Sequence, residues 1–286
     1  MKKTLIALAA VAATGAAFAQ SSVTLDGVVE LGVVRPAAND NSTRLDAANG
    51  ASQIRFRGTE DLGGGLKANF VLAQRLSLES GGNDGSANGR PTFQGESTVG
   101  LSGGFGSLKI GRALTALQGP VNATDPWGTL QQATTAILPS GYYTEPTGSL
   151  DGSGLGRTDA IFYNSPNFSG FQARAAVLLK EDRGAAPAAP AADTRKSSYQ
   201  LAASYKSGPL TVGAAVQSKM AEGANNRTGF AVGARYDFPA VQVSALYTQD
   251  ESRTTGKGFG FGVAVPLGAL MVGAQIARVT DNPNPA

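Results

Sequence analysis

The amino-acid sequence predicts an all-β fold, a transmembrane antiparallel up-and-down β-barrel. Three observations predict it. Apolar and polar residues alternate with period two along the chain, the connections between these segments are alternately short and long, and the polar face is rich in Gly, Ser, Thr and Gln. In such a barrel one face of each strand meets lipid and the other lines water, with short turns at the periplasmic rim and long loops outside.

The composition restricts the function. Charged residues make up 16% of the 286 residues, against roughly 25% in soluble domains. There is no Cys and no His, so thiolate metal sites are excluded and the commonest metal ligand and general base is missing. We therefore expect no enzyme, no catalytic residue, no metal and no cofactor. The formal charge of +3 is too small to indicate nucleic-acid binding.

The first segment, residues 1–19, has the features of a secretory signal peptide. Lys2 and Lys3 precede an apolar stretch from Leu5 to Ala13, and Ala17-Phe18-Ala19 provides a small-x-small cleavage site. We expect the mature chain, residues 20–286, to be exported and to form one barrel domain.

The first alternating segment spans residues 23–33. Val23, Leu25 and Val29 form its apolar face, and the opposite face carries Asp26 and Glu30. The same period recurs at 66–73, 171–177, 199–206, 210–217, 230–238 and 241–248. No convincing helical period is present in the mature chain.

The connections support the barrel. Short ones lie at 61–65, 103–107, 165–170, 206–209, 237–240 and 266–269. Longer polar stretches lie between them at 35–51, 78–91, 114–157, 181–197, 219–228 and 249–257. Aromatic residues near strand ends, including Tyr205, Tyr236, Phe238 and Tyr247, are typical of the girdles at a membrane interface.

Several stretches resemble the general diffusion porins of Gram-negative bacteria, of the neisserial and β-proteobacterial type. The most specific is RFRGTEDLGGGLKANF at 55–70, and the others are SSVTLDGVVELGV at 21–33, STVGLSGGFGSLKIGR at 97–112, YNSPNFSGFQA at 163–173 and SYKSGPLTVGAA at 204–215. The resemblance implies a homotrimer of 16-stranded barrels in the outer membrane, in contact with its lipid and lipopolysaccharide. It also implies an inward-folded third loop that narrows each pore.

The longest unpatterned stretch, residues 114–157, is the counterpart of that third loop. In the family this loop presents acidic groups across the lumen from basic residues on the barrel wall. The acidic candidates here are Asp125, Glu145 and Asp151.

The basic candidates come from strand parity. It places Arg55, Arg57, Arg75 and Lys109 on the lumen face. Arg112 falls on the outward parity, so we expect it past the end of its strand or after a β-bulge, at the base of the loop. We predict a charged constriction from these residues; the alternative is that they only tie loop and wall together.

The predicted function is a water-filled channel for passive diffusion of ions and small hydrophilic solutes, with weak to moderate anion preference. The alternative is a non-conducting barrel that anchors surface loops for adhesion. Lumen-side aromatics are scarce, Phe162 being the clearest, which favours a general pore over a substrate-specific one.

The chain departs from the family pattern in two ways. The family often has Arg where this chain has Gln53, Gly95 and Phe162, and it usually has an aromatic residue at Asp26. About thirteen strands are recognisable, and no terminal strand ending in Phe follows them. We therefore expect a chain truncated at its C-terminus, with about three strands of the family's barrel absent.

Overall fold

The computed structural model describes residues 22–34, 43–46, 52–83, 92–116, 118–124, 157–178, 198–220, 227–250 and 257–281. The predicted signal peptide and the predicted loop residues Asp125, Glu145 and Asp151 lie outside these ranges. In the described residues the fold is all-β apart from one short helix.

The main sheet is antiparallel, and thirteen of its strands follow one path in which each strand pairs with the next along the chain. These strands are β1 (Ser22–Val28), β4 (Gln53–Gly63), β5 (Leu66–Ser77), β7 (Glu96–Gly103), β8 (Gly106–Leu114), β9 (Arg157–Asn164), β10 (Phe171–Leu178), β11 (Ser198–Ser207), β12 (Leu210–Met220), β13 (Arg227–Asp237), β14 (Gln242–Asp250), β15 (Lys257–Leu267) and β16 (Leu270–Asp281). The short β6 (Gly82–Asn83) pairs with the end of β5. This confirms the predicted up-and-down order.

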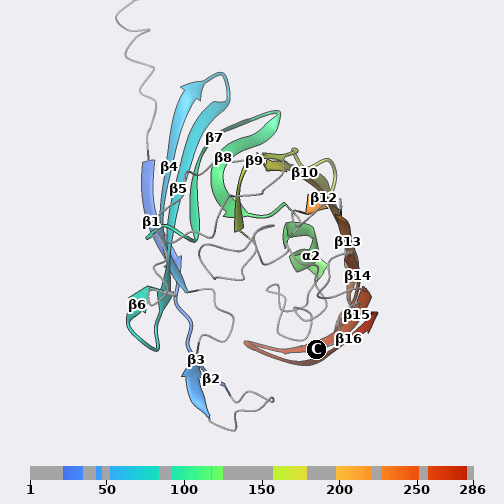
Figure 1. Cartoon of the computed structure of the whole chain (residues 1–286). Coiled ribbons are helices and arrows are strands. Elements are labelled where there is room, and N and C mark those ends of the chain that lie inside the picture. Colours follow the sequence, from blue (N-terminus) through green and yellow to red (C-terminus); the bar gives the residue numbers. More distant parts are fainter. Residues whose placement is uncertain are drawn as a thin grey trace, which may run out of the picture.

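The sheet curls around the helix α2 (Gln118–Thr124), which lies inside its concave side (Figure 1). The six short connections, such as 64–65 between β4 and β5 and 268–269 between β15 and β16, join consecutive strands at one end of the sheet. The stretches 115–156 and 179–197 leave from the other end. The predicted alternation of short turns and long loops is therefore confirmed.

The outer face of the sheet is apolar and exposed. Val99, Ile110 and Ile161 form one row across β7, β8 and β9, and they are 55%, 49% and 38% exposed. The neighbouring row faces inward and contains the buried Thr98 and Ala160. Large apolar residues outside and polar or small residues inside reverse the arrangement of a soluble protein and suit a barrel surrounded by lipid.

The first predicted strand is shorter than its alternation indicated. The expected segment 23–33 divides into β1, which ends at Val28, and β2 (Gly32–Val34), which pairs with β3 (Arg44–Asp46) in a separate two-stranded sheet. Val28 is the last residue opposite β4. Just beyond it, the buried Ser52 hydroxyl accepts a hydrogen bond from the Glu30 backbone N–H and donates one to the Glu30 carbonyl, both at 3.0 Å. These side-chain hydrogen bonds replace the backbone hydrogen bonds between the strands at this point.

The only helix among the described residues, α2, was not predicted. It has seven residues within the long stretch 114–157, and two turns are too few for a 3.6-residue period to be recognised. Within the described part of the chain, no helix has the length and apolar character needed to cross a membrane.

Candidate pore constriction

Two arginines of β4 share one carboxylate on the inward face. Arg55 lies directly opposite Asp26 of β1 in the sheet register, and Arg57 is two residues further along the same face. The Nε of Arg55 is 2.6 Å from Oδ1 of Asp26, and a terminal nitrogen of Arg57 is 2.5 Å from Oδ2. Strand parity therefore predicted the inward face for both arginines correctly. The strand register shows in addition that Asp26 is the acidic residue that links them.

This cluster continues across the sheet as a row of charges. Asp26, Arg55, Ala73 and Glu96 are aligned on β1, β4, β5 and β7. The small Ala73 side chain separates Arg55 from Glu96, two strand spacings apart, or about 10 Å. Acidic and basic groups thus alternate along one level of the inner wall.

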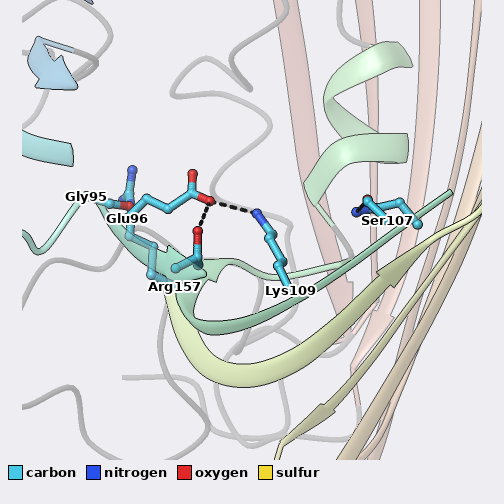
Figure 2. Close-up of polar contacts among 7 residues, drawn as sticks. Gly95, Glu96, Ser107, Lys109 and Arg157 are labelled. Carbon is cyan, nitrogen blue, oxygen red and sulfur yellow. Dashed lines mark hydrogen bonds and ion pairs between the residues drawn. The ribbon is translucent and has the colours of Figure 1, made fainter. Parts of the chain in front are cut away.

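A second charged group forms around Glu96. The Nζ of Lys109, on β8, is 2.8 Å from Oε1 of Glu96, and the Thr98 hydroxyl donates to the same oxygen at 2.9 Å (Figure 2). The Lys109 ammonium also lies 5.5 Å from the ring centroid of Phe162, which is 3% exposed. Lys109 faces inward as predicted and is paired with an acid of the wall.

The two ends of the third loop are tied to residues 94–95. Nε of Arg112, two residues before the end of β8, donates to the Gln94 carbonyl at 3.2 Å. Nε of Arg157, at the start of β9, donates to the Gly95 carbonyl at 2.5 Å. Residues that enter and leave the long loop therefore hold the same short segment.

The placement of Arg112 differs from the expectation of a bulge or a strand end. Its register is unbroken, opposite Ser97 on β7 and Asp159 on β9, and β8 runs two residues further to Leu114. The preceding Gly111 has a φ of +119°, and a Cβ there would lie 2.2 Å from the Ser97 carbonyl oxygen. Glycine at this position allows the left-handed backbone and the close approach of β8 to β7. The two strands keep their register, with no extra residue of the kind that a β-bulge inserts.

Buried amides fix the start of the third loop to the opposite wall. Oε1 of Gln200, on β11, accepts from the Ala116 backbone N–H at 2.9 Å, and Nε2 of Gln200 donates to Oε1 of Gln217 on β12 at 2.9 Å. Both glutamines are at most 1% exposed. The alternation of apolar and polar residues predicts that both glutamines lie on the polar face. It does not predict that they hold the start of the third loop.

The helix α2 packs against β12 and β13 on the inward side. Glycines allow the close contact: a Cβ on Gly233 of β13 would lie 2.3 Å from the Thr124 hydroxyl, and a Cβ on Gly119 would lie 1.4 Å from a terminal nitrogen of Arg174. The beginning of the third loop therefore lies inside the sheet.

The remaining basic candidate, Arg75, lies on β5 opposite Gln53, on the inward parity, and is 5% exposed. The structure thus brings Arg55 and Arg57 together, and it places Lys109 with Glu96 and Arg112 with Gln94. Among the described residues, no group of three His, Cys, Asp or Glu side chains could hold a metal ion.

A curled up-and-down sheet with an apolar exterior and charged groups inside defines a transmembrane β-barrel channel. The family model for the Gram-negative porin matches residues 4–286, and the chain belongs to this family. It is an outer-membrane porin, and porins are channels and not enzymes.

Similar proteins agree with this assignment. Outer membrane porin protein 32 of Delftia acidovorans is 35% identical, covering 94% of this chain and 77% of its own. An outer membrane porin protein of Bordetella pertussis is 30% identical, covering 98% and 78%. Among solved structures, an anion-selective porin from Comamonas acidovorans superimposes with a TM-score of 0.69 at 28% identity, covering 90% of this chain and 78% of that one.

Proposed function

We propose that this porin forms a water-filled channel for passive diffusion of ions and small hydrophilic solutes, with weak to moderate preference for anions. The observation that carries the anion preference is the Asp26 cluster, in which two guanidinium groups share one carboxylate. One positive charge in this cluster is not balanced by an acid, and a positive lumen wall concentrates anions along the path.

The wider charge pattern supports the preference. Among residues whose side chains the structure describes, the basic ones on the inward parity of the strands are Arg55, Arg57, Lys67, Arg75, Lys109, Arg174, Lys206 and Arg235. The acidic ones described on the same parity are Asp26, Asp61, Glu96 and Asp237, which are fewer. The similar solved structure from Comamonas acidovorans is that of an anion-selective porin.

The constriction is proposed to form between the wall and the third loop, 114–157. The wall side would consist of Arg55, Arg57, Arg75, Lys109 and Arg112, and the loop side of Asp125, Glu145 and Asp151. The inward position of α2 (Figure 1) and the hydrogen bond from the Ala116 backbone N–H to Gln200 support a loop that enters the lumen.

Planar-bilayer recording under a salt gradient tests the function. The wild-type chain should give discrete conductance steps with an anion-favouring reversal potential, and Arg57→Gln should reduce that preference. Arg278→Gln is the matched control, because Arg278 is exposed and lies on the outward parity of β16, opposite Phe259. A cation-favouring potential would overturn the anion preference, and the absence of steps would favour the non-conducting surface anchor.

We also propose that residues 1–19 are removed as a signal peptide and that the mature domain, 20–286, assembles as a homotrimer in contact with lipopolysaccharide. The family membership and the small-x-small site at Ala17 to Ala19 support this. N-terminal sequencing of protein from outer membranes should begin at Gln20, and cross-linking in the membrane should stop at three subunits. A sequence beginning at Met1, or a species that stays monomeric, would contradict the respective proposal.

A further inference from the structure

Asp26 contacts both inward arginines of β4. Arg55 contacts the carboxylate through Nε, and Arg57 contacts it through one terminal nitrogen. In the described part of the chain, no ion pair other than the one with Asp26 involves either arginine. The cluster therefore has two cations and one anion.

We propose that Asp26 is a selectivity-determining residue of the pore, which lowers the anion preference that Arg55 and Arg57 would otherwise produce. This inference rests on the proposed function. The side chains of Asp26, Arg55 and Arg57 are 27%, 29% and 47% exposed, so all three lie where a solute and its water reach them. Their charges act on a passing ion through solvent and not through a dry interior.

The size of the effect follows from electrostatics in a water-filled path. A unit charge at about 7 Å from an ion in water changes the ion's energy by an amount equivalent to about a two- to threefold change in its local concentration. The change has opposite sign for anions and cations. Salt reduces it over a Debye length of about 10 Å at 0.1 M, so the contribution of Asp26 is largest in dilute salt.

The position of β1 does not depend on the carboxylate alone. The backbone register of β1 against β4 extends from Ser22 opposite Thr59 to Val28 opposite Gln53. The Ser52 hydroxyl then holds Glu30 through two hydrogen bonds. Replacing Asp26 by its amide keeps the size of the side chain and these backbone contacts while removing one charge.

The test compares Asp26→Asn with Glu60→Gln in planar bilayers under a gradient of dilute KCl. Glu60 is an exposed residue on the outward parity of β4, opposite Ala68, so its substitution changes the net charge of the chain by the same amount outside the lumen. We expect Asp26→Asn to raise the chloride-to-potassium permeability ratio about four- to ninefold in dilute salt, the product of the two opposite changes, and Glu60→Gln to leave it at the wild-type value. Asp26→Glu should also keep the wild-type ratio.

A double variant tests whether the net charge of the Asp26 cluster sets the permeability ratio. Arg57→Gln lowers the ratio, and Asp26→Asn combined with Arg57→Gln should return it close to wild type, because the cluster again has a net charge of +1. An Asp26→Asn ratio equal to wild type would overturn the proposal. So would channels formed by Glu60→Gln but by neither Asp26 variant, because Asp26 would then be needed for folding. Failure of the wild-type chain to conduct would instead overturn the proposed function.

Discussion

Gln200 and Gln217 join their side-chain amides across β11 and β12, with Nε2 of Gln200 2.9 Å from Oε1 of Gln217. The other end of the Gln200 amide accepts from the backbone of Ala116, 84 residues away in the sequence. All of these groups are buried. A polar group on the barrel wall therefore serves as the anchor of the third loop and not as part of the water-exposed lining.

Gln200→Leu should lower the stability of the barrel. The substitution leaves the buried Ala116 N–H without its acceptor, and an unsatisfied buried donor costs about 1–3 kcal/mol. Thermal unfolding of the detergent-folded protein, followed by β-sheet circular dichroism, measures this as a lower Tm. Gln249→Leu is the control, because the described hydrogen bond of Gln249 is a long one of 3.5 Å from Tyr247. Equal Tm values for the two variants would show that the Gln200 contact does not stabilise the fold.

Gly111→Ala should destabilise the base of the third loop. The left-handed φ at this position costs an L-residue about 1–2 kcal/mol, and the added Cβ would meet the backbone of Ser97, which cannot move aside as a side chain can. Gly104→Ala is the matched control, since a Cβ added at Gly104 would have no heavy atom within 4 Å and the residue has no positive φ. Urea unfolding should show a lower midpoint for Gly111→Ala only; a normal midpoint would contradict the strain at this residue.

The barrel architecture could be predicted because its signal is local. Period-two alternation assigns each residue to one face, and this placed Arg55, Arg57 and Lys109 inside before any strand pairing was known. The strand count and the alternation of short and long connections were likewise readable, because they depend only on where turn residues interrupt the pattern.

The contacts within the site could not be predicted in the same way, because they depend on register between strands. Parity places Asp26 and Arg55 on one face, but only the pairing of β1 with β4 sets them opposite each other. The ends of the third loop are held by contacts of Arg112 and Arg157 with main-chain carbonyls. Such contacts leave no mark in the residue types of the acceptor segment.

Glu96→Gln should raise the anion preference, with little effect on stability. The variant keeps an oxygen acceptor for Thr98 and removes the charge that pairs with Lys109 at 2.8 Å. Both partners are about a quarter to a third exposed, and exposed pairs of this kind contribute about 0.2–1 kcal/mol. The reversal potential in a salt gradient should move toward the anion limit while the Tm stays close to wild type. A shift toward cations would show that Lys109 does not act on the permeating ions.

Val263→Arg should destabilise the barrel far more than Leu267→Arg, although both residues lie on the outward face of β15 and are 45% and 57% exposed. Val263 is near the middle of the strand, and Leu267 is its last residue, next to the turn at Gly268. A lipid-facing Arg costs about 2–4 kcal/mol at the bilayer midplane and about 0–1 kcal/mol near the interface. Reversible unfolding from lipid vesicles measures both free energies of unfolding. Equal small costs at the two positions would mean that this face of β15 is covered by water and not by hydrocarbon, because only a lipid environment makes the cost of a charge depend on depth.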